Sequence, residues 1–311
     1  MHAMARLTAA TVGLGAGVLA WSTLVEPRAF ALRRVQAPVL PPGATPLRVL
    51  HVSDLHLVPG QDYRADWLRG LDRLDPHLVV STGDHMAHSD AVPTVLDAFG
   101  PLLDRPGVFV LGSNDYVPPV AKNPLRYFDD SHRRGAELTL RRLPTGDLVR
   151  GLTEAGWTEL TNARVRRRVA GLDLELVGVD DPHLDYDRYD RVAGPAAPDA
   201  DLTIGVTHAP YQRVLDAMAH DGAALLLAGH THGGQVCVPF YGALVTNCDL
   251  DTGRAKGLSR WWEGAGSTPS DQAPADAAYL NVSAGLGASP YSPFRLACRP
   301  EATLLTLVPR D

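Results

Sequence analysis

Short polar clusters that directly follow apolar runs are the feature that most constrains this chain. The clearest is Gly-His-Thr-His at 229–232, which comes immediately after the apolar run 224–228. Four more clusters follow their own runs in the same way: Asp54-Leu55-His56 after 47–53, Gly83-Asp84 after 78–82, Asn114-Asp115 after 108–113, and His208 after 202–207. Such short apolar runs predict buried strands, and α/β sheets gather their ligands at the carboxyl ends of strands. The repeated placement therefore predicts one shared site.

The rest of the chain alternates between further apolar runs and candidate helices. The additional strand candidates are 174–179, 279–282 and 303–308, and the helix candidates are 63–74, 92–103, 146–155 and 211–219. This alternation is typical of an α/β fold. Two stretches interrupt it. We expect 116–142 to be a loop or helical excursion over the site, and the Gly-, Ser- and Pro-rich stretch 251–277 to be mobile.

The amino-terminal part predicts a membrane anchor. Residues 7–25 carry no charge and are long enough to cross a bilayer core. A cleavable signal is the alternative, because Ala29-Phe30-Ala31 resembles a small-residue cleavage site. We favour an uncleaved single-pass anchor within 1–35, since the apolar stretch exceeds the roughly 7–15 residues typical of signal peptides.

Charges and prolines around the anchor predict its orientation and its connection. One Arg precedes the apolar stretch and three follow it, at Arg6, Arg28, Arg33 and Arg34. The positive-inside rule then favours a cytoplasmic catalytic domain at the cell membrane. Residues 36–46 hold four prolines and predict a stiff linker, followed by the main domain over 47–311.

The donor atoms of the clusters predict a metal centre. Carboxylate, amide and imidazole groups occur together without a thiolate, in Asp54, His56, Asp84, Asn114, His208, His230 and His232. Such a set suits Mn²⁺, Fe or Zn²⁺. Seven donors exceed one tetrahedral site but fit two divalent ions that share a carboxylate. Two cations about 3.5–4 Å apart hold a bridging hydroxide and neutralise phosphate oxygens during in-line attack.

The ordered series Asp-x-His, Gly-Asp, Asn, His and Gly-His-x-His resembles the calcineurin-like metallophosphoesterase superfamily. The longer string Gly-His-Thr-His-Gly-Gly-Gln-Val at 229–236 resembles its membrane-associated bacterial branch, as does Val-Ser-Asp-Leu-His at 52–56. The resemblance runs from about 47 to 308. It implies a four-layer α/β/β/α sandwich around a dinuclear centre. It also implies the roles of the ligands: Asp54, His56 and His232 on one metal, Asn114, His208 and His230 on the other, and Asp84 bridging them.

One position departs from the resemblance. The superfamily usually has histidine after the ligand asparagine, where it protonates the leaving group or steadies the phosphate, and here that residue is Asp115. We therefore expect weaker dependence on leaving-group protonation, with Asp115 itself or a substitute donor in the catalytic role. His183 is the substitute we favour, beside His85 and His88. Arg295 is a candidate for binding the substrate phosphate, with a structural arginine as the alternative.

These features predict a membrane-anchored, dimetal phosphoesterase in which a metal-bridging hydroxide attacks phosphorus in line. The membrane branch suggests phosphodiester substrates, membrane lipids among them. A phosphomonoesterase or nucleotide hydrolase is the alternative enzyme. A non-catalytic scaffold that binds a protein partner is the alternative class, and the complete ligand set counts against it. The formal net charge of −6 argues against a nucleic-acid polymer as partner.

Overall fold

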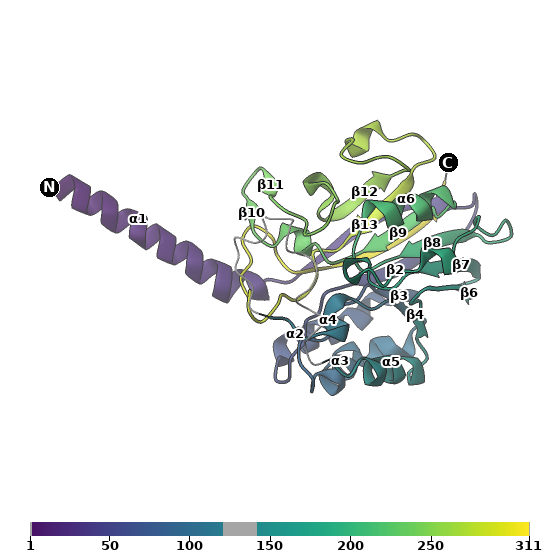
Figure 1. Ribbon diagram of the computed structural model, residues 1–311, viewed down its shortest axis with the longest axis horizontal. Coiled ribbons are helices and arrows are strands. Elements are labelled where there is room, and N and C mark those ends of the chain that lie inside the picture. The colour runs from purple at the N-terminus through teal and green to yellow at the C-terminus, as the bar shows by residue number, and fades with distance from the viewer. Residues whose placement is uncertain (1, 121–141, 311) are drawn as a thin grey trace.

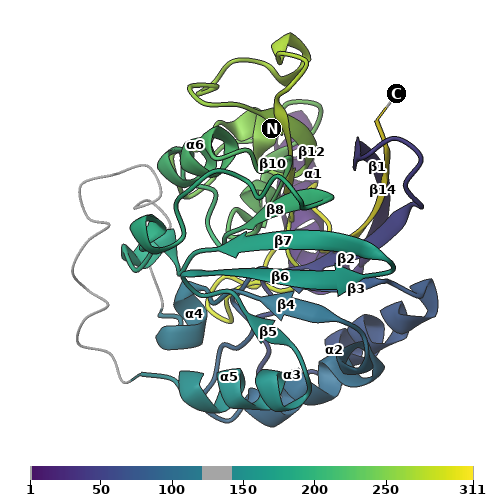
Figure 2. The same cartoon turned by 90° about the vertical axis from the view of Figure 1, so that its right-hand side faces the viewer.

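Two six-stranded sheets packed face to face form the body of the molecule (Figures 1 and 2). The computed structural model describes residues 2–120 and 142–310. Helices cover the outer face of each sheet, so the layers run α/β/β/α. The mixed α/β fold predicted from the alternating pattern is therefore confirmed.

The first sheet combines the two ends of the chain with its first βα units. Its strand order is β1 (Ala31–Leu40), β14 (Glu301–Pro309), β2 (Leu47–Val52), β3 (Leu78–Ser81), β4 (Gly107–Phe109) and β5 (Thr158–Glu159). Strands β2 to β5 are parallel, and β14 is antiparallel to β2. The outer face of this sheet packs against α2 (Asp62–Arg69), α3 (Val92–Phe99) and α5 (Thr145–Glu154).

The second sheet holds the later strands. Its order is β12 (Gly257–Trp261), β13 (Ala278–Val282), β9 (Leu225–Ala228), β8 (Leu202–Val206), β7 (Leu172–Gly178) and β6 (Ala163–Val169). Strands β7, β8, β9 and β13 are parallel, whereas the edge strands β6 and β12 are antiparallel to their neighbours. Helix α6 (Gln212–His220) covers its outer face, and a separate two-stranded ribbon consists of β10 (Cys237–Val238) and β11 (Gly242–Ala243).

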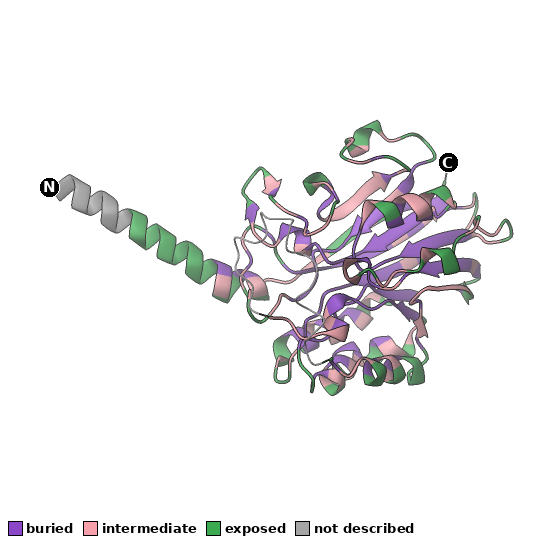
Figure 3. Ribbon diagram, in the orientation of Figure 1, coloured by how far each residue is buried: buried purple, intermediate pink, exposed green. Residues whose placement is uncertain are grey.

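Alternation along the strands builds the two inner layers. In β2, Leu47 and Val49 belong to the core between the sheets, whereas Leu50 and Val52 belong to the core under the helices. Figure 3 shows the resulting buried interior of both sheets. Each side chain of this size contributes about 1.5–3 kcal/mol when fully buried. A strand whose two faces are both apolar is therefore held from both sides, which fixes the position of the polar loop that follows it.

The predicted linker over 36–46 is wrong in its first half. Residues up to Leu40 belong to β1, which pairs in parallel with β14, so the globular domain begins before residue 47. Pro38 does not break this strand because β1 is at the edge of the sheet, where one missing N–H is tolerated. The stretch 251–277, predicted to be mobile, contains β12 and two short 3₁₀ turns.

The amino-terminal segment is helical but does not support the predicted anchor. Helix α1 (His2–Ala20) continues into a π-helical turn, Trp21–Val25, and projects from the body (Figure 1). No helix among the described residues has the length and apolar character needed to cross a membrane. Ala, Gly and Thr dominate α1, and Arg6 lies within it, so its sequence is only moderately apolar. The predicted excursion over 116–142 falls mostly outside the described residues.

Candidate functional site

The loops after β2, β3, β4, β8 and β9 meet where the two sheets face each other, and they bring together all seven predicted ligands. Asp54 and His56 follow β2, Asp84 follows β3, and Asn114 lies in α4 (Ser113–Tyr116), just after β4. His208 follows β8, and His230 and His232 follow β9. Five of them are buried, and Asn114 and His232 are partly exposed. The carboxyl ends of these parallel strands therefore assemble one polar cluster, as the sequence predicts.

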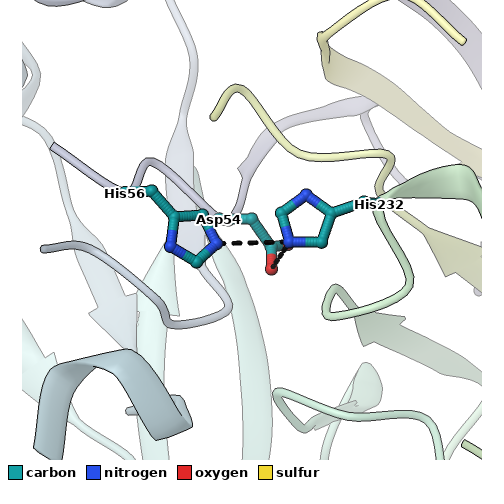
Figure 4. Close-up of side chains that lie close together, drawn as sticks. All are labelled: Asp54, His56 and His232. Carbon is teal, nitrogen blue, oxygen red and sulfur yellow. Dashed lines mark hydrogen bonds and ion pairs between the residues drawn. The ribbon is translucent and has the colours of Figure 1, made fainter. Parts of the chain in front are cut away.

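One group of donors consists of Asp54, His56 and His232 (Figure 4). The Nε2 atoms of His56 and His232 are 3.2 Å apart, and His232 Nε2 is 3.5 Å from Asp54 Oδ1. One donor atom from each residue lies within 4.8 Å of the others. This spacing is compatible with a single ion bound by all three residues.

A second group consists of Asp54, Asp84 and His208, whose donor atoms also lie within 4.8 Å of one another. His230 Nδ1 extends this group at 3.3 Å from His208 Nε2. The two groups share Asp54 and are also connected by Asp84. Its Oδ2 atom lies 3.4 Å from His56 Nε2, and its Oδ1 atom lies 3.6 Å from His208 Nε2. Either carboxylate is placed to be shared between two ions.

Hydrogen bonds at the outer nitrogens determine what the histidines present to the centre. His208 Nδ1 is 2.7 Å from Thr82 O, and His232 Nδ1 is 3.1 Å from Gly287 O. A carbonyl oxygen only accepts, so each of these nitrogens carries the hydrogen. Each Nε2 atom therefore offers its lone pair to the site. This carbonyl-held tautomer is the usual state of a metal-binding histidine.

Charge within the cluster favours a cation. Burial would lower the pKa of His208, but Asp84, Asp181 and Asp54 outweigh it and raise that pKa to about 9. Burial lowers the pKa of His56 to about 4, which keeps it a neutral imidazole at neutral pH. Metal ions bind neutral imidazoles and ionised carboxylates, so an ion at this place would take the position of the proton that the carboxylates hold on His208. The donor set, its geometry and its field thus fit divalent metal ions.

The backbone carries strain at this place. Asp54, His56, Asp84, His230 and His232 all have positive φ, between 43° and 68°. Residues with a side chain rarely adopt this conformation, and each such residue costs of the order of 1–3 kcal/mol. Five strained residues in one cluster are typical of a functional site whose surroundings hold the backbone against its own preference.

Two glycines allow the loops to approach so closely. A Cβ atom at Gly112 would lie 2.4 Å from Asp84 Oδ1, and one at Gly229 would lie 1.9 Å from Ser53 Oγ. Both distances are far shorter than any non-bonded contact. A side chain at either position would therefore displace the loops that carry Asp84 or Asp54.

A buried hydrogen-bond chain behind Asp54 is a feature that sequence reasoning missed. Asn281 Nδ2 donates to His51 Nδ1 at 2.8 Å, so His51 donates through Nε2 to Thr82 Oγ1 at 2.9 Å. Thr82 in turn donates to Ser53 Oγ at 2.7 Å, and the Ser53 hydroxyl hydrogen-bonds to the Asp54 carboxylate. His51 lies inside an apolar run, and only the face-to-face packing of the sheets brings Asn281 to it.

The buried His51 predicts a pH dependence of stability. Burial lowers its pKa to about 3, so below pH 6.5 the unfolded chain binds a proton that the folded chain does not. The free energy of unfolding should therefore fall by about 1.4 kcal/mol for each pH unit between pH 5.5 and 4.5 on account of this group. Urea titrations of the wild type and His51→Gln measure it, since the variant should lose that part of the slope. Parallel pH curves for the two proteins would contradict the buried, neutral state of His51.

Asp115 does not face the site, and its predicted role as a catalytic acid is not supported. Its side chain is fully buried and accepts from the backbone N–H groups of His85 and Gly112, at 2.8 and 3.0 Å. His85 Nδ1 also donates to it at 2.9 Å, and Ser81 Oγ holds the other ring nitrogen. Asp115 therefore ties the loop after β3 to α4. His85 is buried in the same network and is not placed as a donor either.

Arg295 is buried and does not line the cavity, so the arrangement favours the structural alternative over a contact with a substrate phosphate. The side chain is buried, and its guanidinium donates to Ala284 O at 2.8 Å and to Gly287 O at 2.5 Å. Gly287 O is also the acceptor for His232 Nδ1. Arg295 therefore holds the loop that orients His232 and has no free face for a phosphate.

His183 lies at the site, unlike the other candidate donors. Its ring centroid is 4.5 Å from that of His230, and its Nδ1 atom is 3.1 Å from the hydroxyl of Tyr211. A cavity of about 460 Å³ opens onto the cluster and is lined by His183 together with His56, Asp84, Asn114, His230 and His232. His88 is half-exposed and lies outside this lining. His183 is thus placed to reach a group bound beside the predicted ligands.

Sequence comparisons agree with this geometry. Residues 47–234, more than half of the chain, match the family model described as calcineurin-like phosphoesterase. The chain belongs to the calcineurin-like phosphoesterase family. The family and the enzyme class predicted from the sequence, a metal-dependent phosphoric ester hydrolase, are therefore confirmed. All seven predicted ligands lie within the matched range.

Full-length similarity to other family members is moderate. Phosphodiesterase YaeI of Escherichia coli (strain K12) is 26% identical over 308 residues, which span 97% of this chain and 96% of that protein. The transmembrane protein with metallophosphoesterase domain of Bos taurus is 27% identical over 226 residues, 66% of this chain and 45% of that protein. Among solved structures, TT1561 of Thermus thermophilus has a TM-score of 0.41 at 11% identity, covering 78% of this chain and 91% of that one.

Proposed function

We propose that this calcineurin-like phosphoesterase hydrolyses a phosphodiester at a centre of two divalent metal ions. The observation that carries the proposal is the pair of overlapping donor groups, one of Asp54, His56 and His232 and one of Asp54, Asp84 and His208. The naming of YaeI as a phosphodiesterase, over nearly the full length of both chains, supports a diester. Mn, Fe and Zn ions all suit this mixture of oxygen and nitrogen donors.

The predicted ligands form two sets, one for each ion. Asp54, His56 and His232 would hold one ion, Asn114, His208 and His230 would hold the other, and Asp84 would contribute to both. Two bound divalent ions would lower the pKa of water and neutralise the phosphate oxygens. In the present state the Asn114 side-chain amide donates to Asp84 Oδ2 at 2.8 Å, and rotation of that amide presents its oxygen instead.

His183 supplies the proton for the leaving group in this proposal. It lines the cavity next to His230, and the Tyr211 hydroxyl fixes its ring through Nδ1. We assign the opposite ring nitrogen, Nε2, to the leaving oxygen. General acid catalysis by a positioned histidine contributes about 10²–10⁴-fold to a rate. His183 thus takes the role that Asp115, buried away from the cavity, does not fill.

Metal removal and restoration tests the proposal on the full chain. We expect a chelator to abolish hydrolysis of an aryl phosphodiester, and Mn²⁺, Fe²⁺ or Zn²⁺ to restore it. An aryl phosphomonoester assayed in parallel distinguishes the alternative enzyme, which would prefer the monoester. His230→Gln should stay inactive at all metal concentrations that restore the wild type, whereas His220→Gln, at an exposed histidine on α6, should behave as the wild type. A folded, metal-loaded chain that hydrolyses neither ester would contradict the proposal and favour a scaffold.

A further inference from the structure

We infer that the cavity beside the candidate metal centre binds an apolar tail of the phosphoester substrate. The inference rests on the proposed function, because it takes the phosphate to lie at the metal-binding end. At about 460 Å³ the cavity falls in the range that holds an organic molecule of drug-like size. This is far more room than the phosphate group needs.

The two ends of the cavity differ in chemistry. Histidine, aspartate and asparagine side chains line the end at the candidate metal centre. The remaining wall is mainly apolar and includes Val117, Val236, Leu244, Val245, Tyr291 and Phe294, with Thr246, Asn247, Ser289 and Ser292 among them. Because apolar side chains predominate, burial of an aliphatic group there is favourable and needs no hydrogen-bond partner. An aliphatic chain attached to the phosphate fits both ends.

The apolar wall is built as one unit and continues onto the surface. Gln235 Nε2 donates to Ser292 O at 2.7 Å and to Phe294 O at 3.1 Å, which joins the two segments of the wall. Beyond it, the turn between β10 and β11 exposes Phe240 fully and Tyr241 to 75%. Scattered exposed apolar residues are ordinary, but a group of them around a cavity marks a binding surface.

The amino-terminal helix emerges from the same region. Arg295 N donates to Ser22 O at 2.8 Å, and Cys298 N donates to Glu26 Oε1 at 2.5 Å, so the base of the helix is fixed to the segment that follows Phe294. Figure 1 shows the β10–β11 ribbon on the side of the body from which the helix projects. Leu14, Leu19 and Leu24 are exposed on the helix. Exposed apolar side chains therefore occur at the β10–β11 turn, next to the cavity wall, and separately along the projecting helix.

A series of aryl alkyl phosphodiesters tests the inference, because the reaction is the same for every ester and only the alkyl group changes. The alkyl group is methyl, butyl or octyl, and each ester is used below its aggregation concentration. We expect kcat/KM to rise about fourfold for each methylene that enters the cavity. A kcat/KM that is the same for methyl and octyl esters would overturn the inference and leave the proposed function intact. Absence of metal-dependent turnover with every ester would overturn both.

A matched pair of variants assigns the effect to the cavity. Leu244 and Leu14 are both exposed leucines, but only Leu244 lines the cavity. Leu244→Asn should lower the octyl-to-methyl ratio of kcat/KM about tenfold, because a polar group replaces part of the apolar wall. Leu14→Asn should keep the wild-type ratio. An unchanged ratio in Leu244→Asn would overturn the assignment. If the octyl ester is cleaved faster in phospholipid vesicles than when dispersed in water, the substrate comes from a membrane. If the dispersed ester is cleaved faster, the substrate is a dispersed amphiphile.

Discussion

Asp84→Asn is expected to lower kcat/KM for an aryl phosphodiester by on the order of a thousandfold, since charge stabilisation by metal ions is worth several kcal/mol. Asp84 reaches both halves of the cluster, with one oxygen 3.4 Å from His56 Nε2 and the other 3.6 Å from His208 Nε2. The amide of asparagine keeps the shape but removes the negative charge and one acceptor. Both ions should then bind weakly.

The measurement combines steady-state kinetics with metal analysis of the dialysed protein. Wild type should retain two metal ions per chain and the variant one or none. Asp90→Asn is the control, because Asp90 is exposed on the loop before α3 and the same chemical change is then made outside the cavity. Wild-type activity in Asp84→Asn, with its metal retained, would show that this carboxylate is not a shared ligand.

Asp115→Asn is expected to lower the free energy of unfolding by about 1–3 kcal/mol, the cost of an unsatisfied buried polar group. Both carboxylate oxygens accept from backbone N–H groups, Oδ1 from His85 and Oδ2 from Gly112. Whichever way the asparagine amide turns, its NH₂ group meets one of these donors. Chemical denaturation of the metal-free protein measures the loss without a contribution from metal binding.

The same variant separates a structural role from a catalytic one. Asp115→Asn should reduce kcat by a similar factor for aryl leaving groups of low and high pKa, because it displaces Asn114 rather than a proton donor. His183→Gln should reduce kcat mainly for leaving groups of high pKa, which need protonation. If Asp115→Asn instead showed that selective loss, Asp115 would be the acid.

The sequence predicts those site residues whose positions follow from the local order of apolar and polar residues along the chain. Asp54 and Asp84 end short apolar runs, and such runs form the central parallel strands, so their positions follow from the pattern. Roles set by packing do not follow from it. Asp115 adjoins a predicted ligand but turns its carboxylate to His85, 30 residues earlier in the chain. Arg295 donates to the carbonyls of Ala284 and Gly287, and the sequence around Arg295 does not indicate these partners.

The fold shows the same division. Central strands are apolar on both faces, so they are recognisable in the sequence as apolar runs. Edge strands lack this pattern. Strand β6 reads Ala-Arg-Val-Arg-Arg-Arg-Val, with arginines that remain at the edge of the second sheet. Strand β1 contains Pro38, which suggests a linker until its partner is known. Edge strands tolerate charge and proline because one side of their backbone needs no partner.

The parallel pairing of β1 with β14 has a consequence for synthesis on the ribosome. Ala31 pairs with Glu301, so β1 has no partner until a segment much later in the chain has been translated. Until β14 inserts, β2 is an unprotected edge of its sheet, and the loop that bears Asp54 and His56 directly follows this edge strand. Contacts so distant in sequence form slowly, and exposed strand edges aggregate. The sheet that carries Asp54, His56 and Asp84 is therefore complete only after β14 has been translated, so we expect metal loading to follow that step.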